Sequence, residues 1–284
     1  MIKLFPLGTI ALLLLTGCSV ADSLYYYPTH EVYNSPVKDG LISEKVTFKS
    51  ADGTQLSGLF LKSSVPARGT VLHFHGNGAN LSAQYSFVSW LTKYGFNVFE
   101  FDYRGYGDSQ GSPYREGVYQ DAVAAARYLK TRTDIDQTKI IFYGQSLGAA
   151  LVLRVAGENH FDGLVGVVEE SGFATYHGVA HAHYWILGDL FVWPGHEPVN
   201  AAAKISPVPL VVIHGTADSV VPYAQGQEIF DAAKEPKQFW PVEGGGHLPW
   251  VSGGKDALKA HLPKLLNQFN QWVGAPPEEM QFFN

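Results

Sequence analysis

Three residue types that together perform acyl transfer occur at separate turn-like places in this chain: a serine, an aspartate and a histidine. The serine, Ser146, lies in Gly144–Gly148, a segment that fits the pattern G-x-S-x-G. A serine hydroxyl is almost wholly protonated at neutral pH, so it becomes a nucleophile only when an adjacent base takes its proton. The segment therefore predicts a nucleophilic serine, provided that a histidine and an acid can reach it.

His247 and Asp218 are the candidates for the base and the acid. His247 ends a glycine-rich loop after the last expected strand, and Asp218 follows the preceding strand by a few residues. A carboxylate there would hold the imidazole in one tautomer and stabilise the imidazolium. Two alternatives stay open: Asp218 could cap the helix that follows it, and Glu169 or Glu170, at the end of an earlier strand, could supply the acid.

The segment around Ser146 has the elements needed to position a nucleophile. Ile140 to Tyr143 reads as a buried strand, and Ala149 to Ala156 as a helix packed on a sheet. On a sharp turn between them, Gly144 and Gly148 avoid collisions that any side chain would cause. The positive end of the new helix also points at this spot. The alternative is an ordinary serine in a glycine turn.

The rest of the chain alternates between short apolar runs and helical stretches. The first two runs flank an Asp-Gly pair, which indicates a hairpin. The expected strands are Glu44–Ser50, Gln55–Lys62, Thr70–His75, Asn97–Phe101, Gly163–Glu169, Pro209–His214 and Gln238–Val242. The expected helices are Ser82–Tyr94, Val118–Thr131, Ala224–Ala233 and Leu258–Val273. This alternation predicts an α/β fold: a mostly parallel, twisted sheet with helices on both faces.

Composition limits the function further. With 284 residues, 46% of them hydrophobic, the chain can form one large core. A net charge of −6 without any basic run argues against nucleic acid as a partner. The spacing of His177, His181 and His183 could suit zinc, but no carboxylate motif accompanies them, so we expect no metal. His73, His75 and His214 are interpreted as structural, with His75 as a possible support for the loop after it.

The first residues are interpreted as a targeting segment. Lys3 precedes a largely apolar stretch from Leu4 to Leu15, which is shorter than the about 20 residues of a membrane-spanning helix. Leu15-Thr16-Gly17-Cys18 follows, and Cys18 is the only cysteine. This resembles the lipobox of bacterial lipoprotein signal peptides and implies removal of residues 1–17 and acylation of Cys18. The alternative is a plain secretory signal.

That resemblance implies a protein of the bacterial cell envelope, anchored to a membrane by its lipid. Ser19 in place of Asp is similar to an outer-membrane sorting signal in Gram-negative bacteria. Residues 18–40 are predicted to form a tether. Its tyrosines, Tyr25 to Tyr27, would either pack on the domain or sit at the membrane interface.

By its motifs the chain resembles an α/β-hydrolase over about residues 41–273, followed by a tail at 274–284. His73–Gly78 and Asp102–Gly111 resemble a branch that contains serine hydrolases similar to protein depalmitoylases, and relatives known only as hydrolases or peptidases. The family order of nucleophile, acid and histidine gives Ser146, Asp218 and His247.

The resemblance also implies the remaining parts of a site. The backbone N–H groups of Leu147 and Asn77 would form the oxyanion hole. Residues 172–206 would form a small lid, whose aromatic side chains either wall the site or pack tightly on the body. Asp102 and Arg104 are expected to form structural hydrogen bonds.

The function expected from this resemblance is hydrolysis of an acyl ester or thioester, lipid or peptide, through an acyl-Ser146 intermediate. No cofactor is required, since side chains and backbone donors suffice. Two alternatives remain: an acyltransferase with the same three residues, and a lipoprotein that binds without catalysis. The sequence leaves the acyl chain length and the oligomeric state open.

Overall fold

A single eight-stranded sheet runs through the protein, with strand order β1-β2-β4-β3-β5-β6-β7-β8. The computed structural model describes residues 25–184, 195–252 and 254–277. The strands are β1 (Ser43–Lys49), β2 (Gln55–Leu61), β3 (Gly69–Phe74), β4 (Phe96–Phe101), β5 (Ile140–Gln145), β6 (Leu164–Glu170), β7 (Leu210–Gly215) and β8 (Lys237–Val242). β2 pairs antiparallel with β1 and with β4, and the other pairs are parallel. The predicted mostly parallel sheet and its opening hairpin are confirmed.

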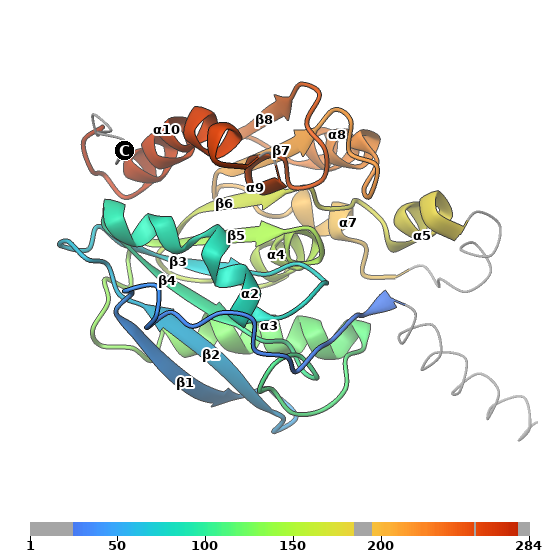
Figure 1. Cartoon of the computed structure of the whole chain (residues 1–284). Coiled ribbons are helices and arrows are strands. Elements are labelled where there is room, and N and C mark those ends of the chain that lie inside the picture. Colours follow the sequence, from blue (N-terminus) through green and yellow to red (C-terminus); the bar gives the residue numbers. More distant parts are fainter. Residues whose placement is uncertain (1–24, 185–194, 253, 278–284) are drawn as a thin grey trace, which may run out of the picture.

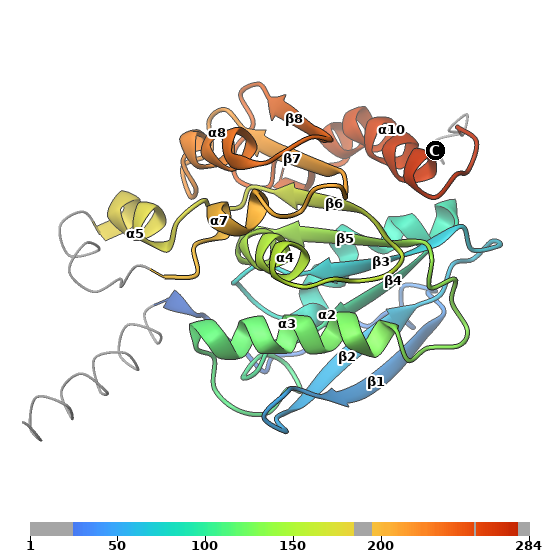
Figure 2. The same cartoon turned by 180° about the vertical axis from the view of Figure 1, so that it is seen from behind.

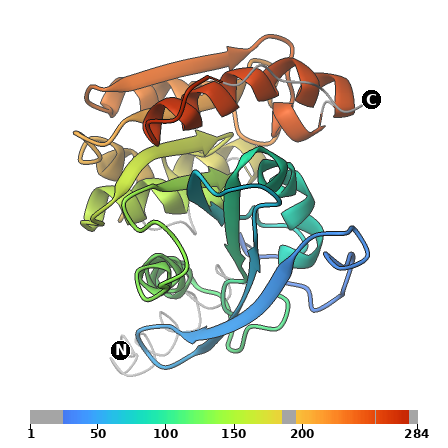
Figure 3. The ribbon, with the colours of Figure 1, turned by 90° about the vertical axis from the view of Figure 1, so that its left-hand side faces the viewer.

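Helices cover both faces of this sheet. They are α2 (Leu81–Gln84), α3 (Arg115–Leu129), α4 (Leu147–Glu158), α5 (Tyr176–Tyr184), α7 (Pro198–Ala202), α8 (Tyr223–Ala232), α9 (Pro249–Ser252) and α10 (Gly254–Trp272), with the 3₁₀ helices η1 (Tyr85–Phe87) and η2 (Ser89–Tyr94). α2 and α10 lie in front of the sheet in Figure 1, whereas α3, α4 and α8 lie in front in Figure 2. Figure 3 shows the two helical layers from the side, with the sheet between them.

Along the strands, successive side chains belong alternately to two hydrophobic cores, one on each face of the sheet. In β3, Val71 belongs to the core under η1, η2 and α10, and Leu72 to the core under α3 and α4. β5 divides in the same way between Ile141 and Phe142. Successive strand side chains point to opposite faces, so apolar residues at every position are needed when helices cover both.

The segment after β3 differs from the single helix expected for residues 82–94. It forms the short α2, and then the 3₁₀ helices η1 and η2. Tyr85, Val88, Leu91 and Tyr94 are its buried apolar residues, and they are spaced by three. A period of three keeps one face inward in a 3₁₀ helix, whereas an α-helix repeats every 3.6 residues. Phe87, which does not fit this spacing, is only partly buried.

Loops that follow β3, β5, β6, β7 and β8 meet at one edge of the sheet. Parallel strands end at the same edge, and ligand sites of open α/β sheets lie outside these carboxyl ends. β3, β5, β6 and β7 are also neighbours in the sheet. Residues that are far apart in the chain therefore lie at the same edge: 76–80, 146, 171, 218 and 247.

Candidate active site

Ser146 sits on a strained turn between β5 and α4. Its backbone has φ 55° and ψ −115°, a conformation that residues other than glycine rarely adopt. A Cβ added to Gly144 would lie 2.3 Å from the carbonyl oxygen of Gly148, and one added to Gly148 would lie 1.9 Å from that of Phe74. Both glycines are therefore required by close backbone packing, as the sequence pattern predicted.

The structure brings His247 and Asp218 to this serine. His247 Nε2 lies 2.9 Å from Ser146 Oγ, and His247 Nδ1 lies 2.9 Å from Asp218 Oδ2. With the carboxylate accepting from Nδ1–H, Nε2 is the nitrogen that can accept the serine proton. The three side chains thus form one chain of hydrogen bonds, in the order acid, base, nucleophile.

Asp218 is held as a carboxylate. Its Oδ1 accepts hydrogen bonds from the backbone N–H groups of Val220 (2.8 Å) and Val221 (2.9 Å). Burial alone would raise the pKa of Asp218, but the hydrogen bond and charge of His247 and the two N–H groups lower it below its ordinary value. These two N–H bonds close a turn before α8, whereas the N-cap of α8 is Pro222 and no side chain caps the helix. The helix-capping alternative for Asp218 is therefore wrong.

The alternative acids, Glu169 and Glu170, have different partners. Glu170 Oε2 accepts hydrogen bonds from Tyr143 Oη (2.5 Å) and Gln145 Nε2 (2.8 Å). Glu169 Oε1 accepts one from the N–H of Gly172. Burial raises the pKa of Glu169 to about 8 and raises that of Glu170 as well. It is the Asp218 carboxylate that contacts the ring nitrogen of His247.

The loop after β3 lies beside the nucleophile. A Cβ added to Gly76 would come within 3.6 Å of Ser146 Cβ. Gln84 of α2 reaches back to this loop: its Oε1 accepts from the N–H of Gly76 (2.8 Å), and its Nε2 donates to the carbonyls of Gly76 and Gly78. Gln84 is thus a buried support of the loop that the sequence analysis missed.

The expected oxyanion donors belong to the helix after Ser146 and to the loop after β3. Leu147 is the first residue of α4, where N–H groups have no acceptor inside the helix. Asn77 follows Gly76 in the loop, and its side-chain amide is engaged away from Ser146, with Tyr106 and residues 25–27. What Asn77 could offer an oxyanion is therefore its backbone N–H.

His75 supports this loop from below. Its Nδ1 lies 2.7 Å from the carbonyl oxygen of Gly76, and its ring centre lies 4.4 Å from that of Tyr103. Burial lowers the pKa of His75 to about 3, so the ring is neutral. Its placement agrees with the expected supporting role.

A further contact attaches the histidine loop to the end of β6. The backbone N–H of Leu248 donates to Ser171 Oγ (3.1 Å), and Leu248 has φ 50°. The N–H of Ser146 in turn donates to the carbonyl oxygen of Glu170 (2.9 Å). Residues 170–171 thereby contact both the nucleophile turn and the histidine loop. No sequence motif marks Ser171, so this link is visible only in three dimensions.

The Asp102–Gly111 loop forms the structural hydrogen bonds expected of it. Arg104 makes a buried pair with Asp121, with an Nη2–Oδ1 distance of 2.8 Å, and also contacts Asp52 at 2.8 Å. Asp102 Oδ1 accepts the N–H of Leu81 at 2.8 Å. These contacts fix the loop against α3 and α2.

The expected lid is described only in part. Residues 185–194, with Trp185, Phe191 and Trp193, lie outside the described residues. In the described part, Phe173 and Tyr176 are buried, and Figure 1 shows α5 extending beyond the end of the sheet beside the first described residues. At its base, the inserted segment therefore packs tightly on the body.

Two predicted absences concern the described residues alone. His177 and His181 stack with ring centres 6.1 Å apart, while the side chain of His183 is not described. Across residues 25–184, 195–252 and 254–277, metal-binding side chains do not gather in any group of three. In the same ranges no helix is long and apolar enough to cross a bilayer.

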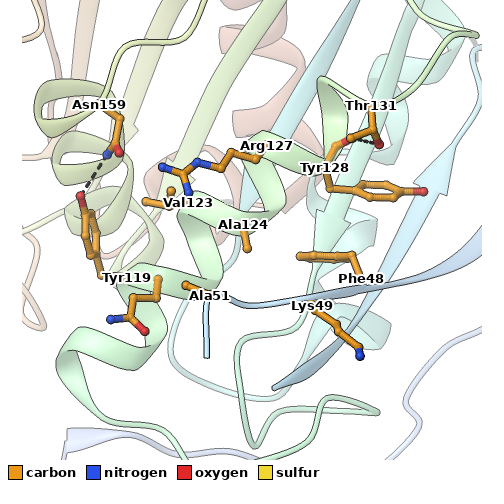
Figure 4. A pocket seen from close by; sticks show the side chains of 11 residues that line it. Phe48, Lys49, Ala51, Tyr119, Val123, Ala124, Arg127, Tyr128, Thr131 and Asn159 are labelled. Atoms are coloured by element: carbon orange, nitrogen blue, oxygen red, sulfur yellow. Dashed lines mark hydrogen bonds between the residues drawn. The ribbon is translucent and has the colours of Figure 1, made fainter. Parts of the chain in front are cut away.

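A separate hollow lies away from the serine, between the opening hairpin and α3. It has a volume of about 460 Å³. Figure 4 shows Phe48 and Tyr128 on one side of it, and Tyr119 hydrogen-bonded to Asn159 (2.9 Å) on the other. Its lining offers no nucleophile paired with a base. We therefore place the candidate active site at Ser146 and not in this hollow.

Comparisons with known proteins concern the family and the fold of the chain. A family model described as serine aminopeptidase, S33, matches residues 65–193. The uncharacterized protein YfhR of Escherichia coli K12 is 36% identical over 250 residues, which cover 86% of each chain. The α/β-hydrolase domain-containing protein WAV2 of Arabidopsis thaliana is 31% identical over 251 residues, or 81% of each chain.

Among solved structures, an esterase from Pyrococcus furiosus superposes with a TM-score of 0.71. It is 21% identical, and the match covers 87% of this chain and 97% of that one. At this identity the likeness concerns the fold, and it confirms the fold class predicted from the sequence.

Proposed function

The chain belongs to the α/β-hydrolase superfamily, and from this membership we propose that it is a serine hydrolase of acyl esters or thioesters. The observation that carries the proposal is the chain of hydrogen bonds from Ser146 through His247 to Asp218, with both distances at 2.9 Å. A nucleophile, its base and a group that orients the base are the parts that acyl transfer needs.

In the proposed mechanism, His247 Nε2 takes the proton of Ser146 as Oγ attacks the acyl carbonyl. Asp218 stabilises the imidazolium that forms. The N–H groups of Leu147 and Asn77 stabilise the oxyanion of the tetrahedral intermediate, where the loss of one such donor costs about 10²–10³ in kcat. His247 then protonates the leaving alcohol or thiol. Water, activated by the same histidine, releases the acid from Ser146.

The direct test is labelling with a fluorophosphonate probe. The full chain should be labelled at Ser146, and Ser146→Ala should remove the label. His247→Ala should also remove it, since no base then accepts the proton. Combining the two substitutions should cost little more turnover than either one, because residues that act as a unit are not additive. A wild-type protein that takes no label, or takes it on another serine, would contradict the proposal.

Product analysis sharpens the reaction type. With a panel of p-nitrophenyl esters of different chain lengths, a hydrolase releases the free acid even when an alcohol acceptor is present. Formation of a new ester as the main product would indicate an acyltransferase that uses the same residues.

We also propose that Cys18 carries a lipid anchor in a bacterial cell envelope. The support is the segment Leu15–Cys18, with the only cysteine at its end. Several acyl chains, at ~0.8 kcal/mol per buried CH₂, would hold the domain at a membrane surface. A fatty-acid probe should label the wild-type chain, and Cys18→Ser should remove both the label and the membrane association. An unlabelled wild-type chain would show the anchor to be absent.

A further inference from the structure

The first described segment of the chain lies directly on the loop that carries Asn77. The side chain of Asn77 forms two hydrogen bonds with the backbone of this first segment. Nδ2 donates to the carbonyl of Tyr25 (2.6 Å), and Oδ1 accepts the N–H of Tyr27 (3.1 Å). Tyr106 Oη donates to the same Oδ1 at 2.6 Å. The amide of Asn77 therefore joins three parts of the molecule: residues 25–27, the loop after β3 and the loop after β4.

A second set of bonds attaches the same segment a few residues later. Asn80 Nδ2 donates to the carbonyls of Thr29 (2.9 Å) and Glu31 (2.8 Å). The N–H of Gly107 also donates to the carbonyl of Thr29, at 2.9 Å. The segment is thus bound both to the loop after β3 and to the loop after β4.

Aromatic packing extends this attachment to the inserted segment. Tyr26 is 3% exposed and belongs to the core. The ring of Tyr25 lies 5.5 Å from that of Tyr176 and 6.2 Å from that of Phe173, both at the base of the insertion. Residues 25–31 consequently bridge the expected oxyanion loop and the insertion beside it.

The loop itself has little in its own sequence to hold it in place. It contains Gly76 and Gly78, and Ala79 has φ 60°. A donor stabilises an oxyanion only when it is fixed at the correct distance, and a displacement of about 1 Å can cost about 10² in rate. Gln84 holds Gly76 and Gly78, and the bonds of Asn77 and Asn80 to residues 25–31 fix the residues beside these glycines.

From this geometry, and resting on the proposed hydrolase function, we propose that residues 25–31 are part of the active site. They act as a clamp that holds the backbone N–H of Asn77 toward the oxyanion. Tyr106 and the side chain of Asn77 are then positioning residues: they act through the loop, without contacting the substrate. Residues 25–31, which follow the proposed lipid anchor, thus form one structural unit with the oxyanion hole.

The test uses two substitutions in the full chain. Asn77→Leu keeps the backbone N–H but removes the amide that bonds to Tyr25, Tyr27 and Tyr106. Tyr106→Phe removes one bond and leaves Asn77 in place. We expect kcat for a p-nitrophenyl ester to fall about 10²-fold in the first variant, the cost of losing one oxyanion donor. In the second we expect a fall of about 3- to 10-fold, from one hydrogen bond.

Three further readouts separate positioning from a loss of fold. The rate of fluorophosphonate labelling at Ser146 should fall in parallel with kcat, because phosphorylation uses the same donors. KM and the pKa of the acid limb of the pH profile should stay unchanged, since Asp218 and His247 are untouched. The melting temperature of Tyr106→Phe should remain close to that of the wild type.

Ser86→Ala is the matched control. Ser86 Oγ donates to the carbonyl of Ala83 (2.8 Å), so this change removes one hydrogen bond of the segment after β3 and leaves Asn77, Asn80 and residues 25–31 in place. We expect its kcat to stay within about twofold of the wild type. Wild-type kcat and labelling rate in a folded Asn77→Leu or in Tyr106→Phe would overturn the clamp. If Asn77→Leu does not fold, Tyr106→Phe decides. A failed hydrolase proposal would instead leave the wild type unlabelled.

Discussion

The neighbouring strands β6 and β7 each carry buried acids at or just after their ends, yet the pKa values of these acids are shifted in opposite directions. After β7, Asp218 has a pKa below its ordinary value. At the end of β6, Glu169 and Glu170 have pKa values above theirs. All three carboxyl groups are buried. Burial alone therefore does not decide which acid is ionised at neutral pH.

The difference comes from the donors that each position offers. Glu170 belongs to a central strand, where backbone N–H groups are engaged with neighbouring strands, so its Oε2 accepts from the side chains of Tyr143 and Gln145. Asp218 lies in a loop, where the N–H groups of Val220 and Val221 donate to its carboxylate and the imidazole of His247 is a further partner. A loop after a strand is thus the better place for a permanently charged acid.

The largest expected effect is on kcat, and it distinguishes Asp218, after β7, from Glu170, at the end of β6. Asp218→Asn should preserve the fold but lower kcat by about 10⁴, because the amide no longer holds the productive imidazole tautomer. Glu170→Gln should lower kcat by less than about tenfold, because Glu170 does not contact the ring. Steady-state turnover of a p-nitrophenyl ester measures both.

Circular dichroism of the two variants controls for folding. A larger loss in Glu170→Gln than in Asp218→Asn would transfer the acid's role to β6 and reverse the comparison.

The next effect concerns pH and stability at β6. The pKa of Glu169 is raised to about 8 in the folded state, so its contribution to stability is fully present below its unfolded pKa of about 4.3 and is lost as pH rises through 8. Between these two pH values the folded state binds one proton more than the unfolded state. The free energy of unfolding therefore falls by about 1.4 kcal/mol for each unit that the pH rises.

Glu169→Gln should remove that slope, since its side-chain oxygen can still accept the N–H of Gly172. Urea unfolding at pH 5, 6, 7 and 8 measures it. If the variant and the wild type show parallel pH profiles, Glu169 ionises normally and the contrast with Asp218 is lost.

The smallest effect tests the side-chain donors of Glu170. Tyr143→Phe removes the hydrogen bond from Tyr143 Oη to Glu170 and a longer one, at 3.4 Å, that Tyr143 Oη accepts from Gln145. The buried carboxyl keeps the amide of Gln145 and a contact, at 3.4 Å, from the N–H of Trp250. We expect a loss of about 1 kcal/mol in the free energy of unfolding, with kcat within about twofold of the wild type. Urea unfolding at pH 7 provides the first value. A kcat reduced about 10³-fold or more would place Glu170 in the catalytic machinery.

Much of the fold was predictable because apolar runs in this chain mark strands clearly. The expected Gln238–Val242 strand, for example, corresponds to β8 at Lys237–Val242. The segment after β3 was not predictable, since the spacing of Tyr85, Val88 and Leu91 by three fits one face of either helix type over so short a stretch. The preference for a 3₁₀ helix there depends on packing against the sheet.

The candidate site, like the fold, was predictable from the sequence only in part. The turn at Ser146 and the late glycine-rich loop of His247 are local patterns, so sequence could propose them. The choice of Asp218 over the glutamates came from the family order of the three residues. Local patterns alone left it open, because it depends on which carboxylate reaches the imidazole. The roles of Gln84 and Ser171 were also invisible, since they bond to residues that only the fold brings near.

The conformation of Ser146 has a thermodynamic consequence. A non-glycine residue in a sparsely populated backbone region costs about 1–3 kcal/mol, and here φ is 55° and ψ −115°. Glycine would adopt this conformation at lower cost, so a protein with glycine at 146 would be more stable and would lack the nucleophile. Selection of this chain for heat resistance alone would favour the inert variant, whereas selection for turnover keeps the serine. Stability and activity are therefore opposed at one residue of this fold.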